Sequence, residues 1–300
     1  MITLSEHNIH LSVKTSCILM AAITIARGSS FLLSKYLLTS LEPLNLLGLR
    51  FLLAFALLFL LFFKQIIRGV KNDLRIIVSA LVLGLVYYLC MAAELSGLKY
   101  TASSTCSFLE NTAIVIVPLL EAVLLRRKLQ PVIIISTVVT VFGIGMIVLR
   151  GSGSSIINIG KGEALCLLAA LMYAAAIIIT DRFSKKHDPM ILGILYVGFM
   201  GLAGLISSLL SETPHLPESG AGWIALIVLA VLCTAFGFAM QPVAQEKISS
   251  ETAGIICGLN PLTTAVLGWI LLGETLRISG IVGAVLILSG ILLPNLKHRP

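Results

Sequence analysis

Apolar runs of roughly 20 residues recur along nearly the whole chain, separated by short polar breaks. A helix of this length spans the hydrocarbon core of a bilayer, because each helical residue advances about 1.5 Å. The breaks are rich in proline, glycine and asparagine, which end helices. The pattern predicts ten membrane-spanning helices, at residues 13–37, 43–63, 74–96, 101–125, 131–149, 163–183, 189–210, 221–243, 250–273 and 278–295.

The composition supports lipid as the surroundings of these helices. Of the 300 residues, 58% are hydrophobic and 12% are charged, whereas about 25% of the residues of a soluble domain are charged. The net charge of +7 could suit a nucleic acid, but the basic residues fall in short breaks without interleaved aromatics, so nucleic acid is excluded as a partner. We therefore predict an all-α, multi-pass protein of the cytoplasmic (inner) membrane, in contact with the lipid bilayer.

The distribution of lysine and arginine predicts the orientation. If the N-terminus is cytoplasmic, 14 of the 21 basic residues fall in cytoplasmic segments and five in external loops, while Arg27 and Arg50 lie inside spans. Cytoplasmic loops of membrane proteins carry such an excess of positive charge. Both termini are therefore expected in the cytoplasm.

A weak internal repeat divides the chain into two halves. Residues 147 positions apart match at Thr105 and Thr252 and again at Gly143 and Gly290. Since each half holds an odd number of spans, the second half must enter the membrane upside down. Inverted repeats are typical of secondary transporters, whose substrate site lies near the midplane between the repeats. The division predicts a first five-helix repeat at 13–149, a linker at 150–162 and a second five-helix repeat at 163–295.

Several motifs are similar to those of the EamA family in the drug/metabolite transporter superfamily. Residues 99–109 and 124–129 resemble the fourth-helix signature of this family, and residues 260–276 repeat it in the second half. The segment Arg27 to Phe31 resembles the first-helix motif, and Arg50 with Phe51 resembles the second. The resemblance covers essentially the whole chain. It implies ten helices, two similar halves, and export or import of metabolites by alternating access.

Three positions depart from the family pattern. Arg27 stands where the family commonly has an aromatic residue. The proline expected in the first half is replaced by Ile114, and the expected acidic residue is replaced by Arg127. The substrate class of other family members therefore does not transfer directly to this chain.

Arg27 and Glu110 are charged residues well inside predicted spans. A charge at this depth costs about 2.5 to 3.5 kcal/mol on insertion scales, so such groups usually pair or face a water-filled cavity. In one interpretation, Arg27 binds an anionic group such as a carboxylate, and Glu110 binds an amine or a proton. The alternatives are a structural ion pair and an Arg27 side chain that extends to the membrane surface.

Polar and aromatic side chains on neighbouring helix faces extend this candidate substrate site. They are Ser30, Tyr87, Met91, Asn111, Tyr173, Gln241 and Asn260. The alternative for such residues is helix packing, because small and hydroxylated side chains let membrane helices approach closely. Glu94 and Glu121 are candidate gate residues near helix ends. Pro261 is a candidate hinge, or a simple kink, because proline removes a helical hydrogen bond.

The cysteines and histidines carry no recognisable chemistry. All six cysteines lie in apolar runs without the spacing of a metal site, and the five histidines lie in tails or loops. We expect no metal and no cofactor. A membrane-embedded enzyme is disfavoured, and the lack of a P-loop motif argues against ATP hydrolysis.

These features together predict a secondary transporter for a small polar or amphipathic metabolite, such as an amino acid. Export is the expected direction, a proton is the candidate coupling ion, and the expected assembly is a monomer or a homodimer. A channel or a non-transporting membrane scaffold is the alternative function. A flux that saturates with substrate would separate a carrier from a channel.

Overall fold

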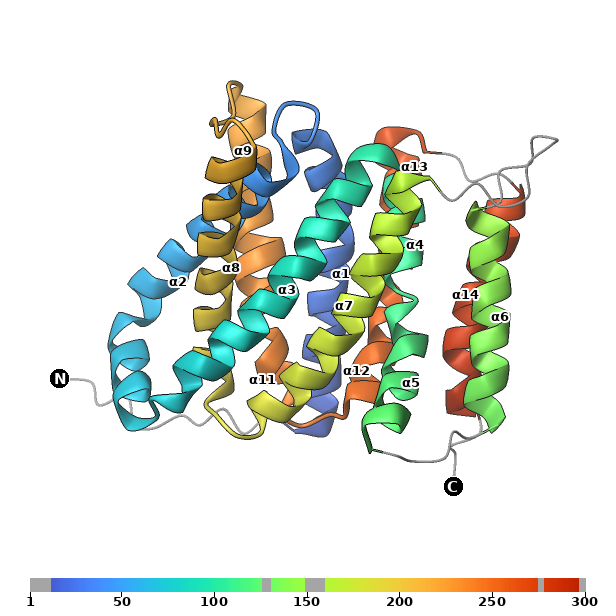
Figure 1. Cartoon of the computed structure of the whole chain (residues 1–300), viewed down its shortest axis with the longest axis horizontal. Coiled ribbons are helices and arrows are strands. Elements are labelled where there is room, and N and C mark those ends of the chain that lie inside the picture. Colours follow the sequence, from blue (N-terminus) through green and yellow to red (C-terminus); the bar gives the residue numbers. More distant parts are fainter. Residues whose placement is uncertain (1–11, 126–130, 149–159, 275–277, 297–300) are drawn as a thin grey trace.

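The computed structural model describes residues 12–125, 131–148, 160–274 and 278–296. Every regular element within these ranges is a helix (Figure 1). Eight segments are long and apolar enough to cross a membrane: Val13–Leu37, Pro43–Asn72, Arg75–Tyr100, Ser103–Val123, Lys161–Ser184, Pro189–Ser211, Gly220–Gln245 and Thr252–Leu272. Two shorter apolar helical stretches, Ile134–Gly143 and Gly280–Gly290, also lie in the described ranges. The described part of the chain is thus an all-helical, multi-spanning fold.

Six helices are described before residue 149, and local sequence signals explain the start of two of them. The six are α1 (Val13–Leu37), α2 (Pro43–Asn72), α3 (Arg75–Tyr100), α4 (Ser103–Glu110), α5 (Ala113–Leu125) and α6 (Pro131–Val148). The Ser12 side chain accepts a hydrogen bond from the Thr15 amide at 3.1 Å and so caps α1. Pro43 opens α2, because its fixed φ suits the first helical position.

Some helices after residue 160 also begin at a side-chain cap or end at a glycine. The helices of this part are α7 (Lys161–Ser184), α8 (Pro189–Ser211), α9 (Gly220–Val228), the π-helix η1 (Leu229–Phe236), α10 (Gly237–Ala239), α11 (Gln241–Gln245), α12 (Ser250–Cys257), α13 (Leu259–Leu272) and α14 (Ile278–Leu296). The Asp188 carboxylate caps α8 by accepting from the amides of Met190 and Ile191. Gly273 ends α13 in the left-handed conformation, with φ of 63°, where glycine carries no steric penalty.

Three predicted spans are not single helices. The span predicted at 101–125 is interrupted at Asn111 and Thr112, and the span predicted at 250–273 is interrupted at Gly258. The span predicted at 221–243 contains η1 and ends in the separate short helices α10 and α11. Pattern reading missed these interruptions because hydropathy does not respond to a local change of backbone.

The second predicted span covers only part of its helix. Residues 43–63 are helical as expected, but α2 continues to Asn72, with a non-helical backbone at Phe62. The continuation carries polar residues such as Lys64 and Arg68 that favour a helix in water. The end of an apolar run therefore marks the limit of the membrane span and not the end of the helix.

α1 and α7 run in opposite directions (Figure 1). Lys35, near the end of α1, donates to the carbonyl oxygen of Thr101 at 2.7 Å. The Thr101 hydroxyl donates to Glu163 in the first turn of α7 at 3.4 Å. The end of α1 and the start of α7 therefore lie at the same end of the molecule.

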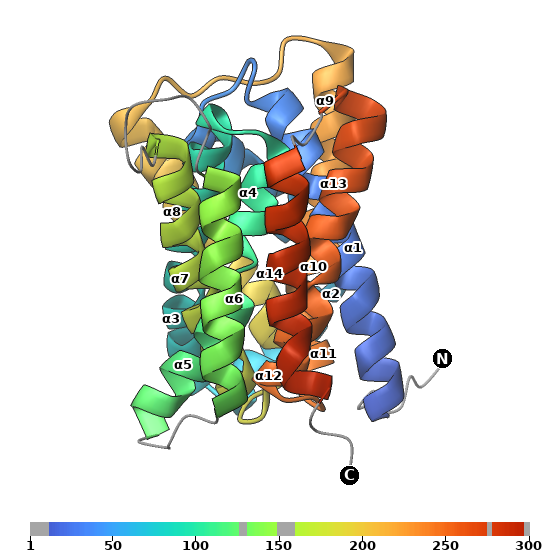
Figure 2. The ribbon, with the colours of Figure 1, turned by 90° about the vertical axis from the view of Figure 1, so that its right-hand side faces the viewer.

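Small residues allow close helix packing in two places. A Cβ added to Gly204 of α8 would lie 2.8 Å from the backbone nitrogen of Gly48 in α2, so these helices touch through their backbones. α6 and α14 lie side by side (Figure 2), where the Ser136 hydroxyl donates to the Gly290 carbonyl. A Cβ on Gly143 would lie 2.8 Å from the carbonyl oxygen of Gly283.

Some sequence predictions concern residues that the structure does not describe. The predicted linker at 150–162 falls mostly on residues 149–159, which lie outside the described ranges. Arg127, which replaces the expected acidic residue, lies outside them as well.

Candidate substrate-binding site

Arg27 of α1 lies in the interior of the molecule with 5% of its surface exposed. Its Nη1 atom donates to the Tyr173 hydroxyl at 2.8 Å and to the Gln241 side-chain oxygen at 3.0 Å. Both acceptors are neutral. The predicted residues Arg27, Tyr173 and Gln241 thus meet, although they come from α1, α7 and α11.

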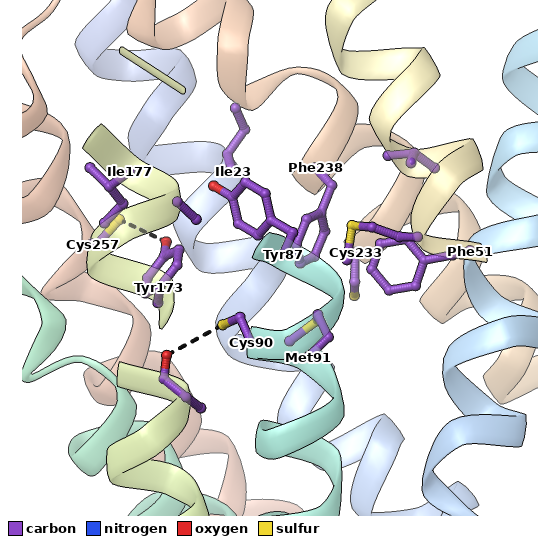
Figure 3. Close-up of a cluster of buried hydrophobic side chains, with 14 of the residues drawn as sticks. Ile23, Phe51, Tyr87, Cys90, Met91, Tyr173, Ile177, Cys233, Phe238 and Cys257 are labelled. Carbon is purple, nitrogen blue, oxygen red and sulfur yellow. Dashed lines mark hydrogen bonds between the residues drawn. The ribbon is translucent and has the colours of Figure 1, made fainter. Parts of the chain in front are cut away.

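Aromatic rings enclose the Arg27 guanidinium. Its central carbon lies 4.6 Å from the ring centroid of Tyr173 and 4.3 Å from that of Phe238. Tyr87 of α3 lies between Tyr173 and Phe238 (Figure 3), with ring centroids 6.3 Å and 5.7 Å away. Tyr196 stacks on Tyr87 at 5.2 Å. Such faces attract a cation through the ring quadrupole.

A second arginine, Arg50 of α2, is fully buried. Its Nε atom donates to the Thr234 hydroxyl at 3.1 Å, and Nη1 donates to the Ser34 hydroxyl at 3.4 Å. Its Nη2 atom has no hydrogen-bond partner among the described residues. Arg50 is therefore a second buried cation that contacts neutral oxygens.

Glu94 and Glu110 are the matching buried acids, with 1% and 0% of their surfaces exposed. Their carboxyl groups lie within hydrogen-bonding reach of each other, and the Cys90 thiol lies 3.8 Å from Glu110. Among the described residues, no ion pair includes Arg27, Arg50, Glu94 or Glu110. The alternative of a structural ion pair between Arg27 and Glu110 is not seen among the described residues, and the buried Arg27 does not extend to the surface.

Glu110 is the last residue of α4, directly before the helix interruption at Asn111. The Asn111 side-chain amide donates to the Ser107 carbonyl at 2.8 Å, and the Thr112 hydroxyl donates to the Leu109 carbonyl at 2.7 Å. The backbone amides of Asn111 and Thr112 donate to the same two carbonyls at 3.1 Å and 3.2 Å, so the side chains add second bonds at the end of α4. The helix is interrupted here even though Ile114 stands in place of the family proline.

A second interruption lies at Gly258, between Cys257 and Leu259. Pro261 falls in the first turn of α13, where a missing amide hydrogen has no helical partner to lose. The Cys257 thiol lies 3.3 Å from the Tyr173 hydroxyl (Figure 3). The interruption at Gly258 thus places the Cys257 side chain beside Tyr173, which contacts Arg27.

Other predicted site residues have more local contacts. The Ser30 hydroxyl donates to the Arg27 carbonyl at 2.6 Å, so it bonds within its own helix. Asn260 packs against Gly28, and Met91 is buried on α3. Glu121 accepts from the Ser250 hydroxyl at 3.0 Å, at the start of α12 and apart from the Arg27 contacts.

Two carboxylates tie helices together at the end of the molecule where α1 ends. Glu212 accepts from the amides of Leu44 and Asn45 at 3.0 Å and 2.7 Å. Glu274 accepts from the amide of Ser103 at 2.9 Å and from the amide of Ser104 at 3.1 Å. These bonds hold the first turns of α2 and α4.

Sequence reasoning missed Arg50 and Phe238 as members of the site. Arg50 had a signal, because a charge inside an apolar span is as costly there as at Arg27. Phe238 had none, since an aromatic residue in an apolar run does not show which face it occupies. Its ring contacts depend on η1 and α10, which the pattern did not predict.

The fold and the buried charges define a multi-pass membrane protein with a polar interior. The chain belongs to the EamA-like transporter family, whose family model matches residues 14–149 and 160–296. The predicted family resemblance is thereby confirmed, and the protein is a membrane transporter.

Relatives in other organisms are named as transporters, without a stated substrate. An uncharacterized transporter of Archaeoglobus fulgidus is 27% identical over 96% of this chain and 100% of its own length. The uncharacterized transporter YetK of Bacillus subtilis is 24% identical over 94% of this chain and 86% of its own. The uncharacterized inner membrane transporter YicL of Salmonella typhimurium is 25% identical over 78% and 77%.

One solved structure, titled as the crystal structure of a protein, has a similar fold. The TM-score is 0.70 over 95% of this chain and 98% of the other, at 16% sequence identity. At this identity the likeness concerns the fold alone.

Proposed function

We propose that this transporter is a secondary carrier that exports a small polar or amphipathic solute bearing a carboxylate, such as an amino acid. The observation that carries the proposal is the environment of Arg27, a buried guanidinium bonded to the neutral oxygens of Tyr173 and Gln241. A buried cation without a contacting anion is costly. An anionic group of the solute would offset that cost through charge-assisted hydrogen bonds.

The aromatic rings suit the rest of such a solute. Tyr87, Tyr173 and Phe238 present apolar faces around Arg27. Small-molecule sites commonly combine apolar and aromatic walls with a few polar groups that fix orientation. A solute with a carboxylate and a modest apolar side chain would match both parts.

Transport would proceed by alternating access between two inverted five-helix repeats. In this arrangement α4 with α5, and α12 with α13, each form one broken span. Two observations support it: the interruptions at Asn111 and Gly258 lie 147 positions apart, and α1 and α7 run in opposite directions. Rocking one repeat against the other would open Arg27 to each side in turn.

The remaining features of the proposal concern placement and coupling. The chain would lie in the cytoplasmic membrane with both termini inside, as the excess of basic residues in the predicted inner segments favours. A proton is the proposed coupling ion, with Glu110 as its binding residue. Solute flux can be measured in proteoliposomes that hold the protein in either orientation, under an outward or an inward pH gradient. These measurements would test the direction of transport and its coupling to protons.

The substrate class can be tested with purified protein in proteoliposomes. The test solutes are L-alanine, L-leucine and L-phenylalanine, each with its deaminated acid and its decarboxylated amine. We expect saturable transport of solutes that keep the carboxylate. Arg27→Gln should lower it about tenfold to a hundredfold, because a hydrogen bond to a charged group contributes about 1.5 to 3 kcal/mol.

Two further variants control for folding and for charge. Ser30→Ala removes a hydroxyl that bonds within α1 and should transport like the wild type. Arg27→Lys keeps the charge but loses the planar fork, so it should retain part of the activity. Unchanged carboxylate transport by a folded Arg27→Gln variant would overturn the proposal. A flux that does not saturate would favour a channel.

A further inference from the structure

Glu94 and Glu110 form a contact that the carboxylate-binding role of Arg27 does not explain. Glu94 belongs to α3 and Glu110 ends α4, and their side chains are within hydrogen-bonding reach of each other. Glu94 Oε1 and Glu110 Oε2 are buried and receive no hydrogen bond from any donor of the described residues. Apart from the Cys90 thiol, a weak donor 3.8 Å from Glu110 Oε1, the two carboxyl groups face each other without a donor from another described residue.

Carboxylate oxygens accept hydrogen bonds but have no hydrogen to donate. Two ionised carboxylates in contact repel each other strongly, and a hydrogen bond between them requires that one carries a proton. The position of Glu110 acts in the same direction, because the carbonyl end of a helix disfavours a negative charge. The contact, the burial of both side chains and their unpartnered oxygens thus favour one proton between the two side chains.

We infer that Glu94 and Glu110 form a proton-binding site that holds one exchangeable proton, and that this proton binds together with the solute carboxylate at Arg27. The coupling to the solute rests on the proposed function, whereas the proton site itself does not.

The buried charges give the reason for the coupling. Arg27 and Arg50 contribute two positive charges, and the pair with one proton contributes a single negative charge. The sum is one positive charge, which a solute carboxylate neutralises. If the pair loses its proton, the buried charges already cancel, and an added carboxylate would leave an uncompensated negative charge. The proton and the carboxylate therefore favour each other's binding.

Other groups near the pair do not change this balance. The titratable and charged side chains that interact with the pair are Arg27 from α1, Arg50 from α2, Cys90 from α3, Cys106 from α4 and Cys257 from α12. Cys166 from α7 contacts Cys106. Buried thiols in apolar surroundings are neutral near pH 7, so only the two arginines contribute charge.

Arg50 supplies independent support for a site at this place. Its Nη2 atom is buried and has no hydrogen-bond partner among the described residues, and its charge interacts with Glu94. A guanidinium donor that has no partner, and whose charge acts on Glu94, would attract the carboxylate that forms when the proton leaves. Proton loss would therefore draw Glu94 toward α2 and separate it from Glu110 at the α4 interruption.

Infrared spectroscopy of the purified protein in lipid nanodiscs tests the proton directly. The wild type should show the carbonyl-stretch band of a protonated carboxylic acid, and the band should disappear reversibly as pH rises. Both Glu94→Gln and Glu110→Gln should lack it, while Glu218→Gln, at an exposed loop position, should keep it. A wild type without the band, or a band unchanged in both pair variants, would overturn the proton site.

Solute binding tests the coupling. The probes are the sodium salts of propionate, 4-methylpentanoate and 3-phenylpropionate, which stay ionised between about pH 6 and 8. Binding should take up about one proton per protein, measured with a pH indicator in weak buffer. Above the titration of the pair, Kd should rise about tenfold per pH unit, and Glu94→Gln should remove this slope.

The two proposals fail in different ways. Carboxylate binding without proton uptake and without the pH slope would overturn the coupling and leave the carboxylate site of Arg27 intact. Absence of binding by all carboxylate solutes would overturn the proposed function, while the infrared band would still decide whether the pair holds a proton.

Discussion

The Sγ atoms of Cys106 and Cys166 lie 2.8 Å apart, and both side chains are fully buried. Cys106 belongs to α4 and Cys166 to α7, so this contact joins the two predicted repeats. Molecular iodine, a small apolar oxidant, should convert the two thiols into a disulfide, releasing two protons and two iodide ions. The tether should abolish most transport, because α4 and α7 could no longer separate, and dithiothreitol should restore it.

Mass spectrometry of the digested protein would identify the linked peptides. Cys106→Ser should transport normally after iodine treatment, since it cannot form the bond. Equal inhibition of the wild type and Cys106→Ser would show that iodine acts elsewhere.

The hydrogen bonds of Glu274 at the start of α4 should contribute to the stability of the protein. Burial raises the pKa of this carboxyl, but hydrogen bonds from Ser103 and Ser104 outweigh burial and hold the pKa below its usual value of 4.5. Glu274→Gln should lower the free energy of unfolding by about 1 kcal/mol at neutral pH, as loss of a helix cap does. Thermal unfolding of the two proteins in the same detergent measures the difference.

The pH dependence of this difference has a definite sign. Because the pKa of Glu274 is lower in the folded state, its contribution is present above pH 4.5 and disappears as pH falls through the folded pKa. The difference in the free energy of unfolding between the wild type and Glu274→Gln should therefore disappear at acidic pH. Glu218→Gln, at an exposed position, should show no such difference at any pH.

Part of the fold could be predicted from the sequence because bilayer thickness fixes the length of each apolar run. The interruption at Asn111 could not, since the expected proline is replaced by Ile114. At that interruption the Asn111 side chain and backbone amide both donate to the Ser107 carbonyl. Such bonds form between residues whose relative placement the hydropathy pattern does not contain.

The candidate site also contains some residues that the sequence predicted and others whose placement it did not predict. Arg27 was predicted from the cost of a charge in lipid, and Tyr173 was predicted as one of the polar and aromatic residues on neighbouring helix faces. The two side chains are in contact. Glu94 was assigned to a gate because it lies near a helix end in sequence. The structure places it fully inside the bundle beside Glu110, because α3 extends to Tyr100.

We expect the contact between the loop of His215 and the loop of Ser40 to depend on pH. The ring nitrogens of His215 face the carbonyl oxygens of Thr213 at 2.9 Å and Ser40 at 2.7 Å. Both bonds form together only when the ring is doubly protonated, so the two carbonyls raise the pKa of His215 above 6.5. The stabilisation is full below pH 6.5 and disappears as pH rises through the folded pKa.

Hydrogen exchange of residues 38–42 would measure this effect. After correction for intrinsic rates, exchange should be faster at about pH 8.5 than at about pH 5.5. His215→Gln should remove the difference. His187→Gln, which changes a histidine bonded to Ser79 and Asp73, should retain it, and its loss in both variants would contradict the assignment to His215.

Two glycines provide a matched test of helix packing. A Cβ on Gly204 would lie 2.8 Å from the Gly48 backbone nitrogen, whereas a Cβ on Gly220 would meet nothing within 4 Å. Gly204→Ala should lower the free energy of unfolding by about 1 to 3 kcal/mol, since extra volume at a tight contact forces the backbones apart. Gly220→Ala should leave stability unchanged or raise it slightly, because alanine favours a helix more than glycine does. Thermal unfolding of both variants measures the contrast, and equal stability would show that α2 and α8 adjust without cost.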